Sequence, residues 1–273
     1  MSHEKKPILR APRASSAMLP LAILLALACG ALLLALSGYS PIEAYGALLR
    51  GSFGNLNAIA EVLVKTTPLL LAALGLTISN RAQVISIGAE GQIYLGAMGA
   101  AAVALFMGAL PAYIAIPLCM VAVFWWVLRR TTLGYQLTVC GANPDAAEAN
   151  GINSRRMIVI SMLISGGMAG LAGAVELMGV HHRLIEEVSP EYGFTAIIIA
   201  VLGRGKPVRV LFAALFFAVL TTGADGMRLT MGTPASIGSI LQALVLLFAL
   251  GSEIFEQRLL TKEQIRLSAA QQR

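Results

Sequence analysis

Charged residues are scarce in this sequence: they make up 12% of its 273 residues, whereas hydrophobic residues make up 57%. A soluble domain carries about 25% charged residues. No polar stretch is long enough to enclose a separate soluble core, which excludes an array of soluble domains. The sequence therefore predicts an all-α fold, a polytopic transmembrane helical bundle.

Motifs for metal binding, catalysis and nucleotide binding are also missing. The three cysteines form neither a disulfide framework nor a metal-ligand pattern. His181 and His182 are adjacent rather than four residues apart, which disfavours a shared metal on one helix face. The string GRGKP at 203–207 lacks the spacing and the hydroxyl of a phosphate-binding loop. We therefore expect no enzyme activity, no cofactor and no metal in this chain.

Apolar runs close to the length of a membrane-spanning helix, about 20 residues, occur seven times. They cover residues 17–37, 59–79, 85–107, 111–128, 157–178, 208–226 and 236–255. An eighth run, 192–203, is too short to cross the membrane alone and fits a half-helix or a re-entrant segment. We predict about eight membrane segments, of which one is short or re-entrant.

The basic residues indicate how these segments are oriented. If the chain starts inside and crosses eight times, sixteen of its twenty Lys and Arg residues fall in inside segments and three in outside loops. Basic loops favour the cytoplasmic side. The sequence therefore predicts one transmembrane domain over 1–273, with cytoplasmic tails at 1–16 and 256–273 and a cytoplasmic loop at 131–156.

Three acidic or basic residues stand near the outer ends of the spans. Glu61 and Lys65 are four residues apart, in the spacing and order of an intrahelical pair. We interpret them as a structural pair near the outer interface. Glu176 lies close enough to the outer end of its span to reach headgroups or a vestibule.

A second polar group opens the run 85–107. Glu90 and Gln92 need hydrogen-bond partners or water if they lie inside the membrane. The adjacent Gly88 and Gly91 permit irregular backbone or close helix contact. A polar knot between helices and the lining of a transport pathway both fit this pattern.

The loop 131–156 carries the signature of a short helix. Asn143 suits the N-cap, Pro144 the first helical position and Gly151 the stop. The helix would have about two turns. Its charge-poor face consists of Ala146, Ala147 and Ala149. Such a face suits docking in a groove of a partner protein, although an ordinary connector between two spans fits the same pattern equally well.

Four sequence blocks stand in a characteristic order: SIGAEGQIYLGA at 86–97, LGYQLTVCGANPDAAEANGI at 133–152, SGGMAGLAGAVELMGVHHRL at 165–184 and GFTAIIIAVLGRGKP at 193–207. Together they resemble permease subunits of ABC importers of the branched-chain amino acid, ribose and nucleoside class. Within that class they are most similar to the simple-sugar or nucleoside permeases.

This resemblance implies ATP-driven import of a small polar solute, a nucleoside or a simple sugar, across a bacterial plasma (inner) membrane. The implied partners are ABC ATPase subunits, a second and similar permease subunit and an extracytoplasmic substrate-binding protein. ATP hydrolysis would take place on the ATPase chains. The alternatives are a secondary transporter or channel without ATPases, and an inactive, shortened permease.

The resemblance also implies roles for particular residues. The residues implied in coupling to the ATPase are Gly141, Asn143, Pro144, Ala146, Ala147 and Gly151. Those implied near the translocation pathway are Gly88, Glu90, Gly91 and Gln92. One departure concerns the stretch between Met107 and Pro111, where such permeases have about two further crossings and this chain has three residues.

Overall fold

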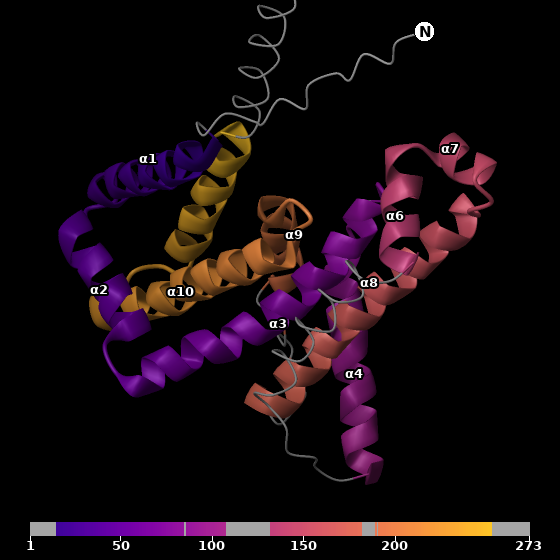
Figure 1. The fold of residues 1–273 in the computed structure, drawn as a ribbon. Coiled ribbons are helices and arrows are strands. Elements are labelled where there is room, and N and C mark those ends of the chain that lie inside the picture. Colours follow the sequence, from indigo (N-terminus) through magenta and orange to yellow (C-terminus); the bar gives the residue numbers. More distant parts are fainter. Residues whose placement is uncertain (1–14, 85, 108–131, 182–188, 190, 253–273) are drawn as a thin grey trace, which may run out of the picture. The chain divides into compact units, whose positions relative to one another are not determined.

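The computed structural model describes residues 15–84, 86–107, 132–181, 189 and 191–252 (Figure 1). Every regular element in these ranges is helical, which confirms the predicted all-α fold class. The predicted span 111–128, the tail 256–273 and most of the tail 1–16 lie outside the described residues.

The described residues form the following helices in chain order. They are α1 (Ser15–Leu36), α2 (Pro41–Phe53), α3 (Leu56–Arg81), α4 (Ala89–Met107), α6 (Thr132–Ala142), α7 (Pro144–Ala149), α8 (Ser154–Glu176), the π-helical turn η1 (Leu177–His181), α9 (Tyr192–Gly203), α10 (Pro207–Met231) and a last helix, Ser236–Ser252.

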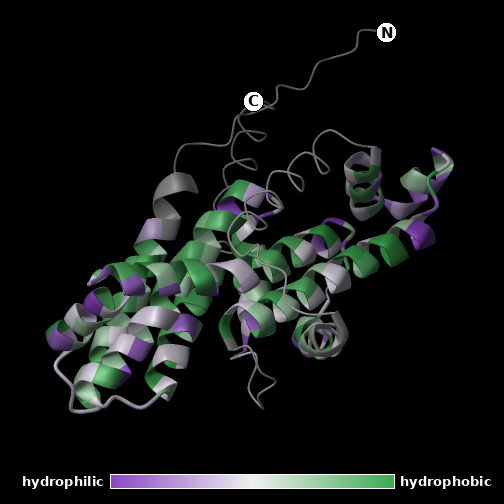
Figure 2. Cartoon of the chain, turned by 90° about the horizontal axis from the view of Figure 1, so that it is seen from below, coloured by the Kyte–Doolittle hydropathy of each residue, from purple (hydrophilic) through white to green (hydrophobic). Residues whose placement is uncertain are grey.

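Several of these helices have the length and composition of membrane spans. In the described part of the chain, three helices are long and apolar enough to cross a membrane on their own: α3, Ser154–Val180 and α10. The broken pair α1 and α2 raises the number to four. The helices Tyr192–Leu202 and Ser236–Ser252 are apolar but shorter. Hydrophobic residues are frequent along the helices, with polar residues at scattered positions, as expected of a polytopic membrane protein (Figure 2).

One predicted span begins later than its apolar run. The run 85–107 forms a helix only from Ala89, and the described residues of 82–88 are not helical. By contrast, the short run 192–203 coincides with α9 and has 12 residues, as predicted.

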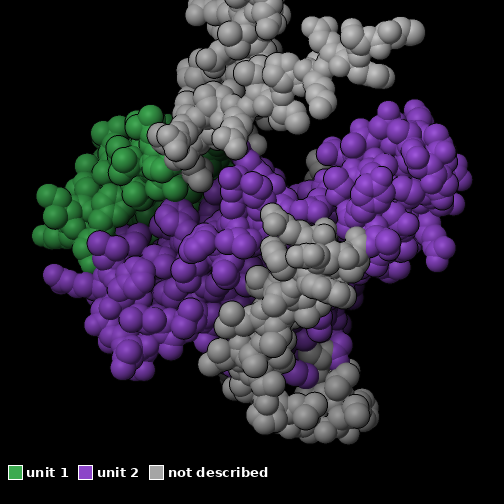
Figure 3. Space-filling model, viewed as in Figure 1, with its two compact units in different colours: residues 1–46, 231–273 green, residues 47–230 purple. Residues whose placement is uncertain are grey.

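The chain divides into two compact units (Figure 3). Unit 1 contains residues 1–46 and 231–273, and unit 2 contains residues 47–230. In unit 1, the Tyr45 hydroxyl donates to the carbonyl of Leu27 in α1 at 2.6 Å. Gly30 of α1 faces the side chain of Leu241, so the last helix packs closely on α1.

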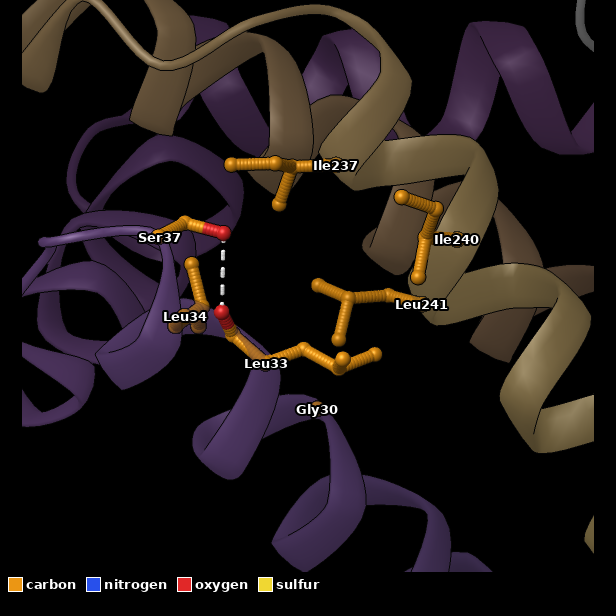
Figure 4. A pocket seen from close by; sticks show the side chains of 7 residues that line it. All are labelled: Gly30, Leu33, Leu34, Ser37, Ile237, Ile240 and Leu241. Atoms are coloured by element: carbon orange, nitrogen blue, oxygen red, sulfur yellow. Dashed lines mark hydrogen bonds between the residues drawn. The ribbon is translucent and has the colours of Figure 1, made fainter.

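A small pocket lies between α1 and the last helix of unit 1 (Figure 4). Its lining residues are Gly30, Leu33, Leu34, Ser37, Ile237, Ile240 and Leu241. The Ser37 hydroxyl donates to the Leu33 carbonyl of its own helix at 2.9 Å. The side chains around the pocket are otherwise hydrophobic, so it does not have the polar groups that would orient a polar solute.

The central helix of unit 2 is α3. In its most apolar window, 78% of the residues are buried, and it contacts both α8 and α9. A helix that is apolar on all sides is expected in such a buried position. It begins at Asn55, whose side chain accepts a hydrogen bond from the backbone N–H of Ala58 at 2.7 Å.

Helices α4 and α8 pack backbone to backbone. Gly96 lies against the backbone of Gly170, and Gly173 lies against the Ile93 carbonyl and the Ala97 amide. A Cβ atom at Gly96 or Gly173 would overlap these atoms. Small residues allow this contact inside a membrane, where burial of apolar surface does not drive helices together.

We expect Gly173→Leu to separate α4 from α8 and to destabilise the protein, because overpacking costs about 1–3 kcal/mol and the overlapping atoms here belong to the backbone. Thermal unfolding in detergent measures the change. The matched control is Gly167→Leu in the same helix, where an added Cβ meets no atom of the described residues within 4 Å. Equal melting temperatures for the two variants would contradict the packing described.

Candidate translocation core and coupling loop

Three chain segments meet at one end of unit 2. The Arg81 guanidinium at the end of α3 donates to the Gly205 carbonyl, which follows α9, at 2.6 Å. Gly141 in α6 packs against the carbonyl of Arg81. The predicted topology requires these three segments to share one side of the membrane. Their proximity meets that requirement, and the assignment of this side to the cytoplasm stays a prediction.

The distance from this end to the start of α9 follows from helix geometry. Gly193 is ten residues from Gly203, so at 1.5 Å per residue it lies about 15 Å along α9 from that end. The hydrocarbon core of a bilayer is about 30 Å thick. For a helix close to the membrane normal, the start of α9 therefore lies near the middle of the core.

Glu90 lies at that start. Its Oε2 accepts a hydrogen bond from the Gly193 backbone N–H at 2.5 Å, and Gly193 has no room for a side chain because Glu90 lies against it. Glu191, the N-cap residue of α9, makes no side-chain capping bond. The Ser189 hydroxyl accepts from the Tyr192 N–H at 3.1 Å, and the carboxylate of α4 accepts from the next N–H, where its negative charge suits the positive end of the helix dipole.

The N-terminus of α4 must therefore lie at about the same depth. The chain reaches it from Arg81 through the non-helical residues before Ala89. Irregular backbone at membrane depth occurs only where it is buried in protein or lines a water-filled cavity. Ser86, in this stretch, is 2% exposed, and its hydroxyl has no hydrogen-bond partner among the described residues.

Two further polar side chains follow Glu90 on α4. The Gln92 amide lies beside Gly166 of α8, and its Oε1 is buried without a hydrogen-bond partner in the described part of the chain. The Tyr94 hydroxyl donates to the Ser189 carbonyl at 3.4 Å. Glu90 therefore makes a polar contact between helices, whereas Gln92 keeps an unused acceptor, and the role of both residues in the pathway stays a prediction.

Gly88 and Gly91, unlike Gly193, have free space where a side chain would begin. A Cβ atom added at either position would meet no atom of the described residues within 4 Å, so neither glycine is required for a close helix contact among them. Gly88 precedes α4 and accepts, through its carbonyl, the backbone N–H of Gln92 at 3.1 Å.

The short helix in the loop 131–156 forms as predicted. Asn143 is the N-cap of α7, and its Oδ1 accepts from the backbone N–H groups of Asp145 and Ala146 at 3.0 and 3.1 Å. Pro144 is the first helical residue. Gly151 has φ +77°, the left-handed conformation that ends many helices.

The three alanines of the predicted docking face differ in exposure. Ala147 is fully buried, whereas Ala146 and Ala149 are exposed. The loop folds back over Ala147, because the Ile152 N–H donates to the Ala147 carbonyl at 2.9 Å. The surface that α7 offers to another molecule contains Asp145, Ala146, Glu148 and Ala149. Ala147 therefore contributes to the shape of the loop rather than to that surface.

The comparisons with known proteins identify the class of this chain. The model of the family described as branched-chain amino acid transport system / permease component matches residues 112–250. This range includes the loop 131–156 and the helices α8, α9 and α10. The chain belongs to this family and is a polytopic membrane permease subunit of an ABC importer.

Named relatives support the same class. A glucose ABC transporter permease protein of Haloferax volcanii is 28% identical over 333 residues, which cover 87% of each chain. A guanosine ABC transporter permease protein of Bacillus subtilis is 26% identical over 330 residues, covering 88% of this chain and 94% of the relative. A nucleoside ABC transporter permease protein of Lactococcus lactis is 37% identical over 145 residues, which cover 53% of this chain and 40% of the relative.

The alignments with the first two of these relatives exceed the length of the chain. They run over 333 and 330 residues, whereas this chain has 273, so dozens of aligned positions in these relatives have no counterpart here. This difference agrees with the internal shortening inferred near Met107. No solved structure gives a significant match to the chain.

We expect Glu90→Ala to destabilise the protein by about 1–3 kcal/mol, because the Gly193 N–H loses its acceptor inside the membrane. Glu90→Gln keeps an oxygen acceptor and should retain most of the stability. Thermal unfolding in detergent compares the two, and Glu43→Ala at an exposed position of α2 serves as the control. The expectation fails if Glu90→Ala unfolds at the same temperature as the Glu43 control.

Proposed function

We propose that this chain forms the pathway for a nucleoside or a simple sugar in an ATP-driven importer of the bacterial plasma (inner) membrane. Residues 1–273 make up a single permease domain with both termini in the cytoplasm. The chain works with a second, similar permease subunit, two ABC ATPase subunits and an extracytoplasmic substrate-binding protein. ATP is hydrolysed on the ATPase subunits, and this chain is not an enzyme.

The observation that carries this proposal is the family match over residues 112–250, which includes the loop 131–156. The solute class is supported by the relatives, whose names specify glucose, guanosine and nucleosides. The residues assigned to the pathway are Gly88, Glu90, Gly91 and Gln92. Support for this assignment comes from the N-termini of α4 and α9, which meet near the middle of the membrane at Glu90 and Gly193. Broken helices that start at mid-membrane form solute sites in other transporters.

Coupling to the ATPase is assigned to the loop 131–156, with Gly141, Asn143, Pro144, Ala146, Ala147 and Gly151. In this assignment Asn143, Pro144, Ala147 and Gly151 hold α7 in shape, and the exposed Ala146 meets the ATPase. Gly141 lets α6 approach the end of α3 at Arg81. A displacement of α7 is thereby transmitted to the central helix of unit 2.

A second candidate is an inactive, shortened permease. It is favoured by one observation: the chain is shorter than the alignments with its longest-matching relatives. Uptake in proteoliposomes separates the two candidates. The permease, its ATPase subunits and its binding protein should accumulate labelled guanosine or glucose only when ATP is present inside. A complex that assembles but accumulates neither solute would support the inactive form, and uptake without ATPases would support a secondary transporter.

Within this assay, we expect Ala146→Arg to abolish uptake and to weaken co-purification of the ATPase subunits, because a bulky cation would enter a small, desolvated contact. The permease itself should still fold, since Ala146 is exposed. Gln136→Arg, in α6 of the same loop, is the control for added charge. If Ala146→Arg retains uptake and ATPase binding at the level of this control, α7 does not contact the ATPase.

A further inference from the structure

A lysine in α3 joins two carboxylates from different parts of the chain. The Lys65 Nζ lies 3.1 Å from the Glu61 Oε1 of the same helix and 2.5 Å from the Asp225 Oδ2 of α10. The predicted ion pair between Glu61 and Lys65 is confirmed, and Asp225 is a second partner of Lys65 that was not predicted. These three residues are called the Lys65 group below.

The Lys65 group lies far from the end of unit 2 that contains Arg81. Sixteen residues separate Lys65 from Arg81 in α3, which corresponds to about 24 Å along the helix. In a core about 30 Å thick, Lys65 is therefore near the opposite surface. In the proposed orientation this surface is the outer one, where the solute enters.

The carboxylates of the group are accessible, although they belong to apolar helices. The side chains of Glu61 and Asp225 are 52% and 49% exposed, whereas that of Lys65 is 15% exposed. Contact between a charged carboxylate and lipid is costly, so charged side chains in spans usually face water-filled cavities or one another. The open sides of Glu61 and Asp225 therefore face water rather than acyl chains.

Polar groups from two more helices lie around the Lys65 group. Glu176 of α8 is 3% exposed and lies within electrostatic range of Lys65. Tyr192, the first residue of α9, is 3% exposed and lies within electrostatic range of Glu61, Glu176 and Asp225. The outer ends of α3, α8 and α10 and, deeper in the membrane, the start of α9 thus contribute polar groups within electrostatic range of one another.

A buried hydroxyl adds to this region without a partner of its own. Thr222 lies one turn before Asp225 on the same face of α10 and is 2% exposed. Its Oγ1 has no hydrogen-bond partner among the residues that the structure describes. A buried hydroxyl without a partner costs free energy, which a bound polar molecule would recover.

The hydrogen-bonding capacity and the net charge of the Lys65 group indicate which ligands it can bind. The ammonium of Lys65 already donates to Asp225 and pairs with Glu61, so the unused capacity consists mainly of carboxylate oxygens, which accept hydrogen bonds. One cation and two carboxylates leave a net negative charge. In the described part of the chain, no three His, Cys, Asp or Glu residues are arranged to hold a metal ion. The group thus favours hydroxyl donors and repels anions.

We propose that the Lys65 group lines the outer entrance of the solute pathway, where it accepts hydrogen bonds from the hydroxyl groups of a neutral solute and excludes anionic solutes. The entrance would admit a free sugar or nucleoside and reject the corresponding phosphate. This inference rests on the proposed function, because it assigns the entrance to the same pathway.

Charged thiol reagents test the entrance without transport or ATPase subunits. Val64, beside Lys65 in α3, is 43% exposed and is replaced by cysteine in the full chain after removal of the three native cysteines. Two membrane-impermeant methanethiosulfonates are added from outside, one carrying trimethylammonium and one carrying sulfonate. Their rates are normalised to those with a free thiol in solution. We expect the cationic reagent to react about fivefold faster or more, because a nearby negative charge attracts it and repels the sulfonate.

A second variant tests whether the carboxylates of the Lys65 group cause the faster reaction of the cationic reagent. Asp225→Asn removes one negative charge and should reduce the preference for the cationic reagent several-fold. If Asp225→Asn does not yield folded protein, Glu61→Gln replaces it, since Glu61 does not join two helices. Absence of labelling by both reagents would overturn the proposal, because the face would then be covered by lipid or by a second copy. Labelling without charge preference, or with a preference that neither variant changes, would overturn it as well.

A failure of the proposed entrance can be distinguished from a failure of the proposed transport function. Thiol labelling reports on the entrance in the isolated permease, whereas uptake in proteoliposomes reports on transport. A charge preference without uptake would leave the entrance intact in a shortened, inactive permease. Uptake without a charge preference would contradict only the role of the Lys65 group.

Discussion

The hydrocarbon core of a bilayer contains no water to satisfy a backbone N–H, and the centre of unit 2 depends on this constraint. Helix α9 begins near mid-membrane, where the Ser189 hydroxyl accepts from the Tyr192 N–H but the N-cap residue Glu191 supplies no acceptor for the Gly193 N–H. The Glu90 carboxylate from α4 supplies the acceptor, and Gly193 leaves the space for it. This bond places the start of α4 at the same depth as the start of α9, and the described residues of 82–88 are not helical. Close contact between α4 and α8 then fixes α4 in position.

The two ends of unit 2 differ in chemistry, and this difference agrees with import. At one end, Arg81 binds the turn after α9, and the loop with α6 and α7 packs beside it. At the other end, Lys65 and its carboxylates join α3 to α10. The central helix α3 spans both regions and contacts α6, α8 and α9. In the proposed function, α3 thus connects the coupling loop to the proposed entrance.

The sequence predicted the helices well because the length of an apolar run and the capping residues are local properties. The cap at Asn143, the short helix α9 and the pair Glu61–Lys65 are examples. Contacts between distant segments had no such signal. The bond from Glu90 to Gly193 spans 103 residues and that from Lys65 to Asp225 spans 160, so neither partner was identified. Burial of Ala147 depends on a backbone reversal that residue types alone do not specify.

The depth at which α4 begins is the central claim, and cross-linking to α8 measures it most directly. Gln92 lies beside Gly166, which is twelve residues into α8, whereas an α4 that started at the membrane surface would place Gln92 nearer Val159, on the same face of α8. In a chain without native cysteines, a short bifunctional thiol reagent should join cysteines at 92 and 166 but not at 92 and 159. Efficient joining of 92 to 159, without joining of 92 to 166, would contradict the account.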